Sequence, residues 1–211
     1  MRSSNCRLFA YLAVVALAGL PIVAAADEWD ACVKLSDDLA VAGCSRAIDS
    51  HQYTGRSLAR LYARRGGAYQ AKGDLDRAIA DFNESMRVDP TYPAAYNNRG
   101  SAWYHRGELD RAIADFDQAI RLDSNYEYAY VNRGSAWGAK GDLDRAIADF
   151  NQAIRLDPKD AQAYYDRGIA WEKKRSLREA LADFKMHSQL ASSDPDGLKA
   201  VERVLKELSA R

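Results

Sequence analysis

Apolar positions recur along this chain with a helical period. In the stretch "LDRAIADFDQAI" (109–120) they fall on one face of a helix, with charged residues between them. These positions are Leu109, Ala112, Ile113, Phe116, Ala119 and Ile120. Just upstream, Tyr96, Gly100 and Trp103 form a stripe at i, i+4 and i+7. Gly107 separates the two stretches and is expected to end the first helix in a left-handed conformation. The pattern predicts two amphipathic helices joined by a tight turn.

This two-helix pattern returns every 34 residues. The phrase "GDLDRAIADFNESMRVDP" (73–90) recurs almost unchanged at 107–124 and 141–158. Several columns extend over four copies, among them Tyr62, Tyr96, Tyr130 and Tyr164; Arg65, Arg99, Arg133 and Arg167; and Phe82, Phe116, Phe150 and Phe184. One helix pair cannot bury its own apolar face, so a fixed period of this length is typical of stacked units. The period predicts an all-α solenoid of antiparallel helix hairpins.

The columns in the second copy resemble the tetratricopeptide repeat. The matching residues are Tyr96, Gly100, Trp103, Ala112, Phe116 and Ala119. The resemblance implies a right-handed superhelical solenoid over residues 57–192, in four units: 57–90, 91–124, 125–158 and 159–192. The fourth unit departs from the pattern, because Arg175 replaces the turn glycine, His187 the small residue and Ser192 the proline. Ser176 and Glu179 are predicted to form a capping box there.

Segments on both sides are predicted to complete the array. Residues 193–211 are interpreted as a C-terminal capping helix. Its apolar residues, expected to face the stack, are Leu198, Val201, Val204, Leu205 and Leu208. Residues 27–56 are interpreted as a divergent N-terminal helical hairpin (28–51) with a link (51–57), in which Cys44 takes the place of the phenylalanine.

Residues 1–26 are predicted to be a secretory signal peptide. Arg2 and Arg7 precede an apolar run from Leu8 to Val23, and alanines at 24–26 supply a cleavage site after Ala26. The alternative is a retained anchor, but a run of 16 residues is shorter than the roughly 20 that span a bilayer. Cleavage would give an exported protein, which we assign to the periplasm of a Gram-negative bacterium.

Cysteine usage fits export. Cys6 leaves with the signal peptide, and Cys32 and Cys44 remain as an even pair. In an oxidising compartment this pair predicts a disulfide; the alternative is two buried free thiols.

The charge of the chain bears on which classes of partner can be expected. The chain has 30 basic and 30 acidic side chains, and loss of Arg2 and Arg7 leaves 28 basic ones. Such a balanced, interspersed distribution gives no electrostatic reason to expect nucleic acid or an anionic membrane as a partner. No later segment is apolar enough to span a membrane, so the mature chain is expected to have no membrane span.

No catalytic constellation stands out. The chain has no Gly-rich phosphate loop, no G-x-S-x-G motif and no paired-histidine metal motif. His51, His105 and His187 are far apart in the array, and the cysteines lack C-x-x-C spacing. We expect no enzyme activity, no cofactor and no metal; a hydrolase or redox enzyme is the least favoured alternative.

The arginine column at Arg65, Arg99, Arg133 and Arg167 has two interpretations. It can recognise anions along a groove, or it can form structural ion pairs with carboxylates on neighbouring helices, which we favour. The charges within "DRAIAD" are predicted to form exposed i, i+4 pairs such as Arg111–Asp115.

The resemblance implies a concave groove, lined by the first helix of each unit, that holds an extended peptide or a partner helix. The candidate binding residues are Asn98, Asn132, Asn97, Tyr104, Tyr128, Tyr165, Arg60, Arg64 and Asp166. Asparagine amides both donate to and accept from a peptide backbone, and tyrosines add contact area. The alternative is that these side chains only solvate the groove. The two-lysine carboxylate clamp of chaperone-binding members is absent.

The sequence therefore predicts a non-catalytic scaffold that binds a protein or peptide partner, whose identity the sequence leaves open along with the oligomeric state. The alternative is a structural subunit that self-associates or assembles a complex through its ends or its convex face.

Overall fold

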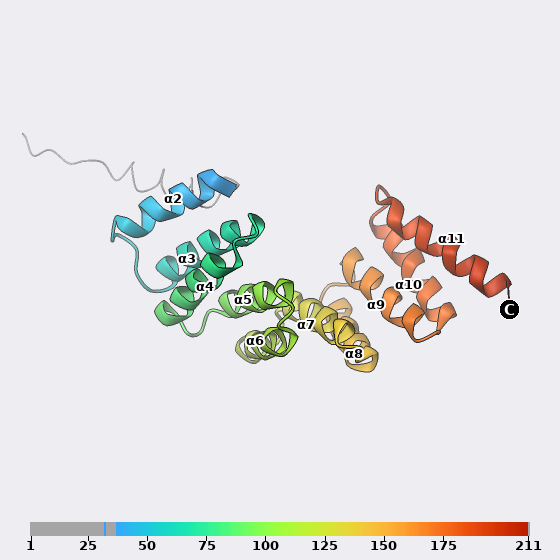
Figure 1. The fold of residues 1–211 in the computed structure, drawn as a ribbon. Helices are drawn as coiled ribbons and strands as arrows, with labels where there is room; N and C mark the ends of the chain where they lie inside the picture. Colours follow the sequence, from blue (N-terminus) through green and yellow to red (C-terminus); the bar gives the residue numbers. More distant parts are fainter. Residues whose placement is uncertain (1–31, 33–36, 211) are drawn as a thin grey trace, which may run out of the picture.

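The computed structural model describes residue 32 and residues 37–210, and the predicted signal peptide lies outside this part of the chain. The described residues form ten α-helices and no strand, so the all-α class is confirmed. The helices are α2 (Asp37–Asp49), α3 (Gly55–Ala71), α4 (Leu75–Val88), α5 (Pro93–His105), α6 (Leu109–Leu122), α7 (Glu127–Ala139), α8 (Leu143–Leu156), α9 (Ala161–Lys173), α10 (Leu177–Leu190) and α11 (Pro195–Ser209). They follow one another in an arc from α2 to α11 (Figure 1).

The helices pack in consecutive pairs, and the pairs stack. α3 packs on α4, α5 on α6, α7 on α8 and α9 on α10, and each second helix then packs on the next first helix. The first helices α3, α5, α7 and α9 also contact one another in that order. Since the first helices lie closer together than the second helices, the stack curves toward them, and in Figure 1 α5 lies inside α6 along the arc. The predicted solenoid of helix hairpins is confirmed.

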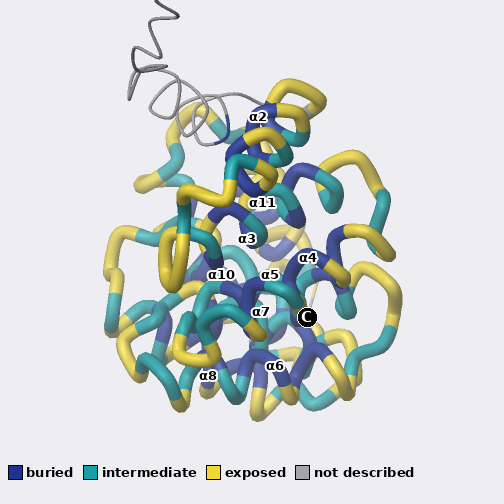
Figure 2. Tube along the Cα trace, turned by 90° about the vertical axis from the view of Figure 1, so that its left-hand side faces the viewer, coloured by how far each residue is buried: buried dark blue, intermediate teal, exposed yellow. Residues whose placement is uncertain are grey.

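The apolar core is divided along the arc. Each interface between neighbouring pairs has its own cluster of buried residues, such as Ala112, Ile113, Phe116 and Ala136 between the second and third pairs. Figure 2 shows buried positions distributed along the helices from end to end. Each pair therefore depends on its neighbours for burial, as expected of a solenoid.

Each pair is held at a close crossing of a glycine with a phenylalanine. The crossings are Gly66 with Phe82, Gly100 with Phe116, Gly134 with Phe150 and Gly168 with Phe184. A Cβ atom on Gly100 would stand 2.7 Å from Cε1 of Phe116, closer than two non-bonded carbon atoms can approach. The absence of a side chain on the first helix thus sets the distance between the two helices.

The turn after each first helix needs a left-handed residue. Gly73, Gly107 and Gly141 have φ values of 78°, 81° and 85°. Arg175 keeps this conformation in the fourth unit, with φ 65°, although it carries a side chain. A left-handed conformation costs a non-glycine residue roughly 1–2 kcal/mol, so the packing of the last unit imposes the turn against local preference.

The predicted capping box of Ser176 and Glu179 is wrong. Ser176 lies at the N-cap of α10 with ψ 68°, and its side chain makes no capping hydrogen bond. At the equivalent places in α4 and α8, Asp74 and Asp142 have similar ψ values, and each accepts a bond of 3.1 Å from the backbone N–H three residues on. A carboxylate reaches one atom farther than a serine hydroxyl, and at this backbone angle only the longer side chain closes the gap.

His187 makes in the last unit the hydrogen bond that Ser85 makes in the first. Ser85 Oγ donates to the carbonyl of Ala59 at 2.7 Å, and three units later Nδ1 of His187 lies 3.0 Å from the carbonyl of Ala161. Because a carbonyl only accepts, Nδ1 carries the proton. The larger ring fits because Gly197 of α11 faces it, and a Cβ at that position would overlap the ring.

Helix α11 caps the stack through a narrower face than predicted. Gly197, Ala200 and Val204 are buried at i, i+3 and i+7. Leu198 and Leu205, predicted to face the stack, are 56% and 45% exposed. Each follows a buried position by one residue, which turns it about 100° around the helix and out of the interface.

At the other end, Cys32 and Cys44 are joined by a disulfide, as predicted. The bond joins residue 32 to Cys44 on α2, within the N-terminal segment. Cys44 is buried in a cluster with Ile48 and with Leu61 of α3, and this apolar contact connects the segment to the first unit. The first helix of the predicted hairpin falls largely outside the described residues. Helix α3 begins at Gly55, which makes the link shorter than the predicted 51–57.

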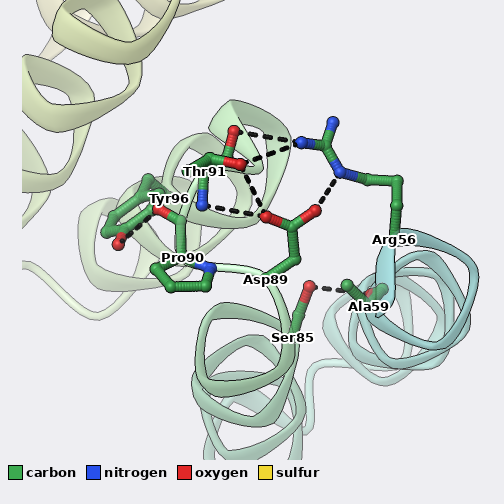
Figure 3. A network of polar contacts seen from close by, with 7 residues as sticks. All are labelled: Arg56, Ala59, Ser85, Asp89, Pro90, Thr91 and Tyr96. Atoms are coloured by element: carbon green, nitrogen blue, oxygen red, sulfur yellow. Dashed lines mark hydrogen bonds and ion pairs between the residues drawn. The ribbon is translucent and has the colours of Figure 1, made fainter. Parts of the chain in front are cut away.

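The first two units are also joined by polar contacts at their outer ends (Figure 3). Arg56, at the start of α3, pairs with Asp89 and donates to Oγ1 of Thr91 at 3.1 Å, in the turn between α4 and α5. Asp89 in turn accepts from the backbone N–H of Thr91 at 2.9 Å. One guanidinium thus connects the beginning of one unit to the beginning of the next.

Two glycines on the first helices give a matched test of the close crossing. Gly100→Ala should destabilise the protein by roughly 1–3 kcal/mol, because its Cβ would displace the ring of Phe116. Gly67→Ala should stabilise it by about 0.5–1 kcal/mol, because nothing lies within 4 Å of a Cβ there and alanine favours the helix. Urea unfolding followed by circular dichroism measures both. Equal effects of the two substitutions would contradict the crossing as the distance-setting contact.

Candidate binding groove

A row of three hollows follows the first helices along the inner side of the arc. The first, of about 220 Å³, is lined by residues of α3 and α5 together with Tyr92, among them Arg60, Arg64 and Asn98. The second, of about 440 Å³, lies between α3, α5 and α7 and is lined by Gln70, Asn97, Asn98, Ser101, His105 and Asn132. The third, of about 240 Å³, lies between α5, α7, α8 and α9, and its lining includes Tyr104, Ser135, Gly138, Phe150, Asp166 and Ile169.

Most of the candidate binding residues line these hollows. The structure places Arg60, Arg64, Asn97, Asn98, Asn132, Tyr104 and Asp166 there. Tyr128 lies at the start of α7, is 66% exposed and touches the ring of Tyr126 edge-on. Tyr165 turns toward the last unit, where its ring packs against Phe184 and His187. Their assignment to binding stays a prediction.

The asparagines form a short hydrogen-bonded chain across two helices. Nδ2 of Asn132 on α7 donates to Oδ1 of Asn97 on α5 at 2.9 Å, and Nδ2 of Asn97 lies 3.4 Å from Oδ1 of Asn98. Asn97 is buried and therefore serves mainly to join the helices. Both Asn98 and Asn132 line the second hollow, and within the described residues Oδ1 of Asn132 and the amide hydrogens of Asn98 have no partner.

The arginine column is structural. Each arginine makes two hydrogen bonds of 2.6–2.9 Å to an aspartate sixteen residues on, and the pairs are Arg65–Asp81, Arg99–Asp115, Arg133–Asp149 and Arg167–Asp183. The bond to Asp115 raises the pKa of Arg99 above its usual range, against the effect of burial. The same guanidinium also donates to Asn83 on α4 at 2.7 Å and so connects neighbouring units.

The predicted exposed pair Arg111–Asp115 is wrong. Asp115 is buried and bound by Arg99, while Arg111 pairs with Glu108 at 2.7 Å. The i, i+4 spacing on one helix suggested the wrong partner. The constant interval of sixteen residues between arginine and aspartate, repeated four times, was the signal that could have revealed the right one.

Three acidic side chains, Asp166 on α9, Asp160 at its start and Glu127 on α7, form a group, and of these only Asp166 lines the last hollow. Oδ1 of Asp166 accepts from Gln162 at 2.8 Å. Burial, with a further contribution from Asp160, raises the pKa of Asp166 to about 6, although the bond from Gln162 and the proximity of His187 act in the opposite direction. Burial and the same Asp160 raise the pKa of Glu127 to about 7. This end of the groove therefore holds closely spaced carboxyls.

The described residues contain no group of three or more histidine, cysteine or acidic side chains placed to hold a metal ion. Within the same part of the chain, no helix is long and apolar enough to cross a membrane.

Comparison with known proteins identifies the family. A family model described as "TPR repeat" matches residues 138–174, and one described as "Tetratricopeptide repeat" matches residues 57–127, which together are more than half of the chain. The chain belongs to the tetratricopeptide repeat (TPR) family. Proteins of this family are in general non-catalytic scaffolds for protein–protein interaction.

Solved structures of TPR proteins resemble the fold. MamA is 26% identical with a TM-score of 0.62, over 74% of this chain and 89% of that one. The first TPR of Spaghetti (RPAP3), bound to the HSP90 peptide SRMEEVD, is 26% identical with a TM-score of 0.55, over 59% of this chain and 98% of that one. YrrB, described as a TPR protein with an unusual peptide-binding site, is 18% identical with a TM-score of 0.62, over 80% and 84%, and supports the fold alone. No curated protein sequence matches this chain.

The raised pKa of Asp166 predicts that this groove residue weakens the fold. An acid whose pKa is higher in the folded state contributes stability when protonated, and this stability is lost as pH rises from about 4 through about 6. Asp166→Asn should therefore raise stability at pH 7 by about 1 kcal/mol, a figure kept low because solvent reaches part of the side chain. The gain should disappear near pH 4. Thermal unfolding at both pH values measures it, and a gain of equal size at both would contradict the assignment.

Proposed function

We propose that this protein is a non-catalytic scaffold that binds an extended peptide or a partner helix in the groove lined by α3, α5, α7 and α9. One observation carries this proposal: the three hollows follow one another along the first helices, and the central one is lined by carboxamide and hydroxyl groups. Such groups pair with a peptide backbone whatever its sequence, because each peptide unit offers one donor and one acceptor.

The roles that we propose for individual groove residues follow from the positions of their side chains. Asn98 and Asn132 hold the backbone of the bound segment with the donors and acceptors that the fold leaves available. Tyr104 and the exposed ring of Tyr128 add contact area at one side. Arg60 and Arg64 give the α3 end a basic character, while Asp166 makes the other end acidic. The groove is thus basic at one end and acidic at the other, and this difference in charge orients the bound peptide.

The peptide bound by the RPAP3 domain supports this use of the fold, since the two proteins are 26% identical. The recognition chemistry is expected to differ. Where chaperone-binding members carry one lysine of the carboxylate clamp, this chain has Ala63, Asn97, Val131 and Tyr165. The groove therefore selects its ligand by other groups than a paired-lysine clamp.

Export is part of the proposal. We infer that residues 1–26 direct the chain to the periplasm of a Gram-negative bacterium and are removed after Ala26. The disulfide between Cys32 and Cys44 supports an oxidising compartment. The division into an N-terminal segment (27–56), four units (57–192) and a capping segment (193–211) likewise stays a prediction.

The alternative function, self-association through the ends, has its own observation. Leu198 and Leu205 on α11 and Leu39 on α2 are exposed at opposite ends of the arc. Head-to-tail contact of these helices would extend the solenoid from one copy to the next. Light scattering over a hundredfold range of concentration tests it, and a molar mass that stays at the monomer value contradicts it.

The groove assignment predicts the effect of removing the two amides. In binding to an array of random 12-residue peptides, Asn98→Ala with Asn132→Ala should weaken the best peptides roughly tenfold, as expected for the loss of about two hydrogen bonds. Helicity should be unchanged at 20 °C.

The matched control changes carboxamides on the second helices, outside the groove. Gln118→Ala with Gln152→Ala removes the same chemical groups from α6 and α8 and should leave peptide binding at the wild-type level. Equal binding by wild type and the Asn98/Asn132 variant would overturn the groove assignment.

A further inference from the structure

The third hollow is lined at one position of the groove wall by a glycine, which has no side chain. The column at this position reads Gln70, Tyr104, Gly138 and Glu172 in the four units. Gly138 lines a space of about 240 Å³ between α5, α7, α8 and α9, roughly eight times the volume that one water molecule occupies. That is room for a side chain of five to seven heavy atoms. Nothing in the local geometry demands the glycine, because a Cβ there would meet only Ala146 at an ordinary 3.8 Å.

The lining combines apolar walls with hydrogen-bond acceptors. Phe150 and Ile169 contribute apolar surface, and Tyr104 lies at one side. Ser135 also lines the space, and its hydroxyl hydrogen is used on the carbonyl of Val131 at 3.0 Å, which leaves lone pairs for a ligand. Asp166 adds a carboxylate whose Oδ2 accepts no hydrogen bond within the described residues.

The charges around Asp166 are mainly negative. Asp160 at the start of α9 and Glu127 at the start of α7 belong to the same group of carboxyls. Two basic side chains are near: His187 of α10, which lowers the pKa of Asp166, and Lys173, which also lines the space. Lys173 follows Asp166 by seven residues, or about 10 Å along the helix axis, and the two side chains form no ion pair within the described residues. A cation arriving at Asp166 therefore meets an unneutralised carboxylate.

We propose that this hollow receives one lysine or arginine side chain of the bound peptide, with its aliphatic stem against Phe150 and Ile169 and its cationic head at Asp166 and Ser135. A cation beside Tyr104 also gains from the negative face of an aromatic ring. A neutral apolar side chain fills the same space but leaves the carboxylate unpaired, and an acidic one is repelled. This inference rests on the proposed function and names the class of ligand that the groove selects.

The test uses random 12-residue peptides and three variants of the full mature chain. Wild type should enrich peptides with lysine or arginine, and replacing that residue by norleucine, which keeps the stem and lacks the charge, should weaken binding about tenfold. Asp166→Asn should abolish this difference between the lysine and norleucine peptides. Gly138→Leu should abolish it by filling the hollow, whereas Gly138→Ala, which adds one methyl group, should retain it.

The outcomes separate this inference from the proposed function. Both Gly138 variants should fold, since each replaces a helical glycine by a better helix former, and circular dichroism verifies this. Capture of peptides without preference for lysine or arginine, or a preference that survives both Asp166→Asn and Gly138→Leu, overturns the cation pocket and leaves the groove intact. Failure of wild type to capture any peptide overturns the groove and the pocket together.

Discussion

The rest of the structure depends on the distance at which the two helices of each unit cross. That distance is set where a glycine of the first helix lies on the phenylalanine ring of the second, as Gly100 does on Phe116. In all four units an arginine directly precedes the glycine and an aspartate directly precedes the phenylalanine. The close crossing therefore also brings guanidinium and carboxylate within bidentate reach, as in Arg99 and Asp115. The apolar contact and the buried ion pair both depend on the close crossing of the two helices. If the helices moved apart, the aspartate would be left buried without its partner.

The crossing also determines where function can reside. Glycine and arginine occupy the face of the first helix that meets the second helix, which leaves the opposite face to form the inner wall of the arc. Positions on that wall vary from unit to unit, as the column Gln70, Tyr104, Gly138 and Glu172 shows, while the crossing repeats unchanged. Because the helix crossing is the same in every unit while the residues on the inner wall differ, each unit can present different side chains to one ligand. Asp166, a carboxyl of this wall whose pKa is raised by burial, is the kind of local conflict expected at a functional site.

The first and last units of the solenoid have a neighbouring unit on one side only, and the two ends of the chain cover them in different ways. At the N-terminus the disulfide of Cys32 with Cys44 adds a covalent bond to the buried cluster between α2 and α3. At the C-terminus α11 covers the last unit, and its Gly197 accommodates the enlarged side chain of His187. The departures of the fourth unit from the repeat pattern are thus adaptations to a different neighbour, and Arg175 keeps the turn of the glycine it replaces.

The sequence by itself determined the repeat and the pairing of helices, and it favoured the disulfide and the structural role of the arginine column. The repeat pattern is informative here because each unit contacts only its neighbours. Equivalent positions in different units are therefore buried in the same way. Features that depend on contact between helices required the tertiary structure. The partner of Arg99 depends on the crossing and not on spacing along one helix, and the exposure of Leu198 and Leu205 depends on which face of α11 meets α10. The failure of Ser176 to cap depends on a backbone angle, and the hollow at Gly138 depends on four helices at once. A sequence pattern indicates which residues tend to be buried, whereas the distances between helices decide which side chains are in contact.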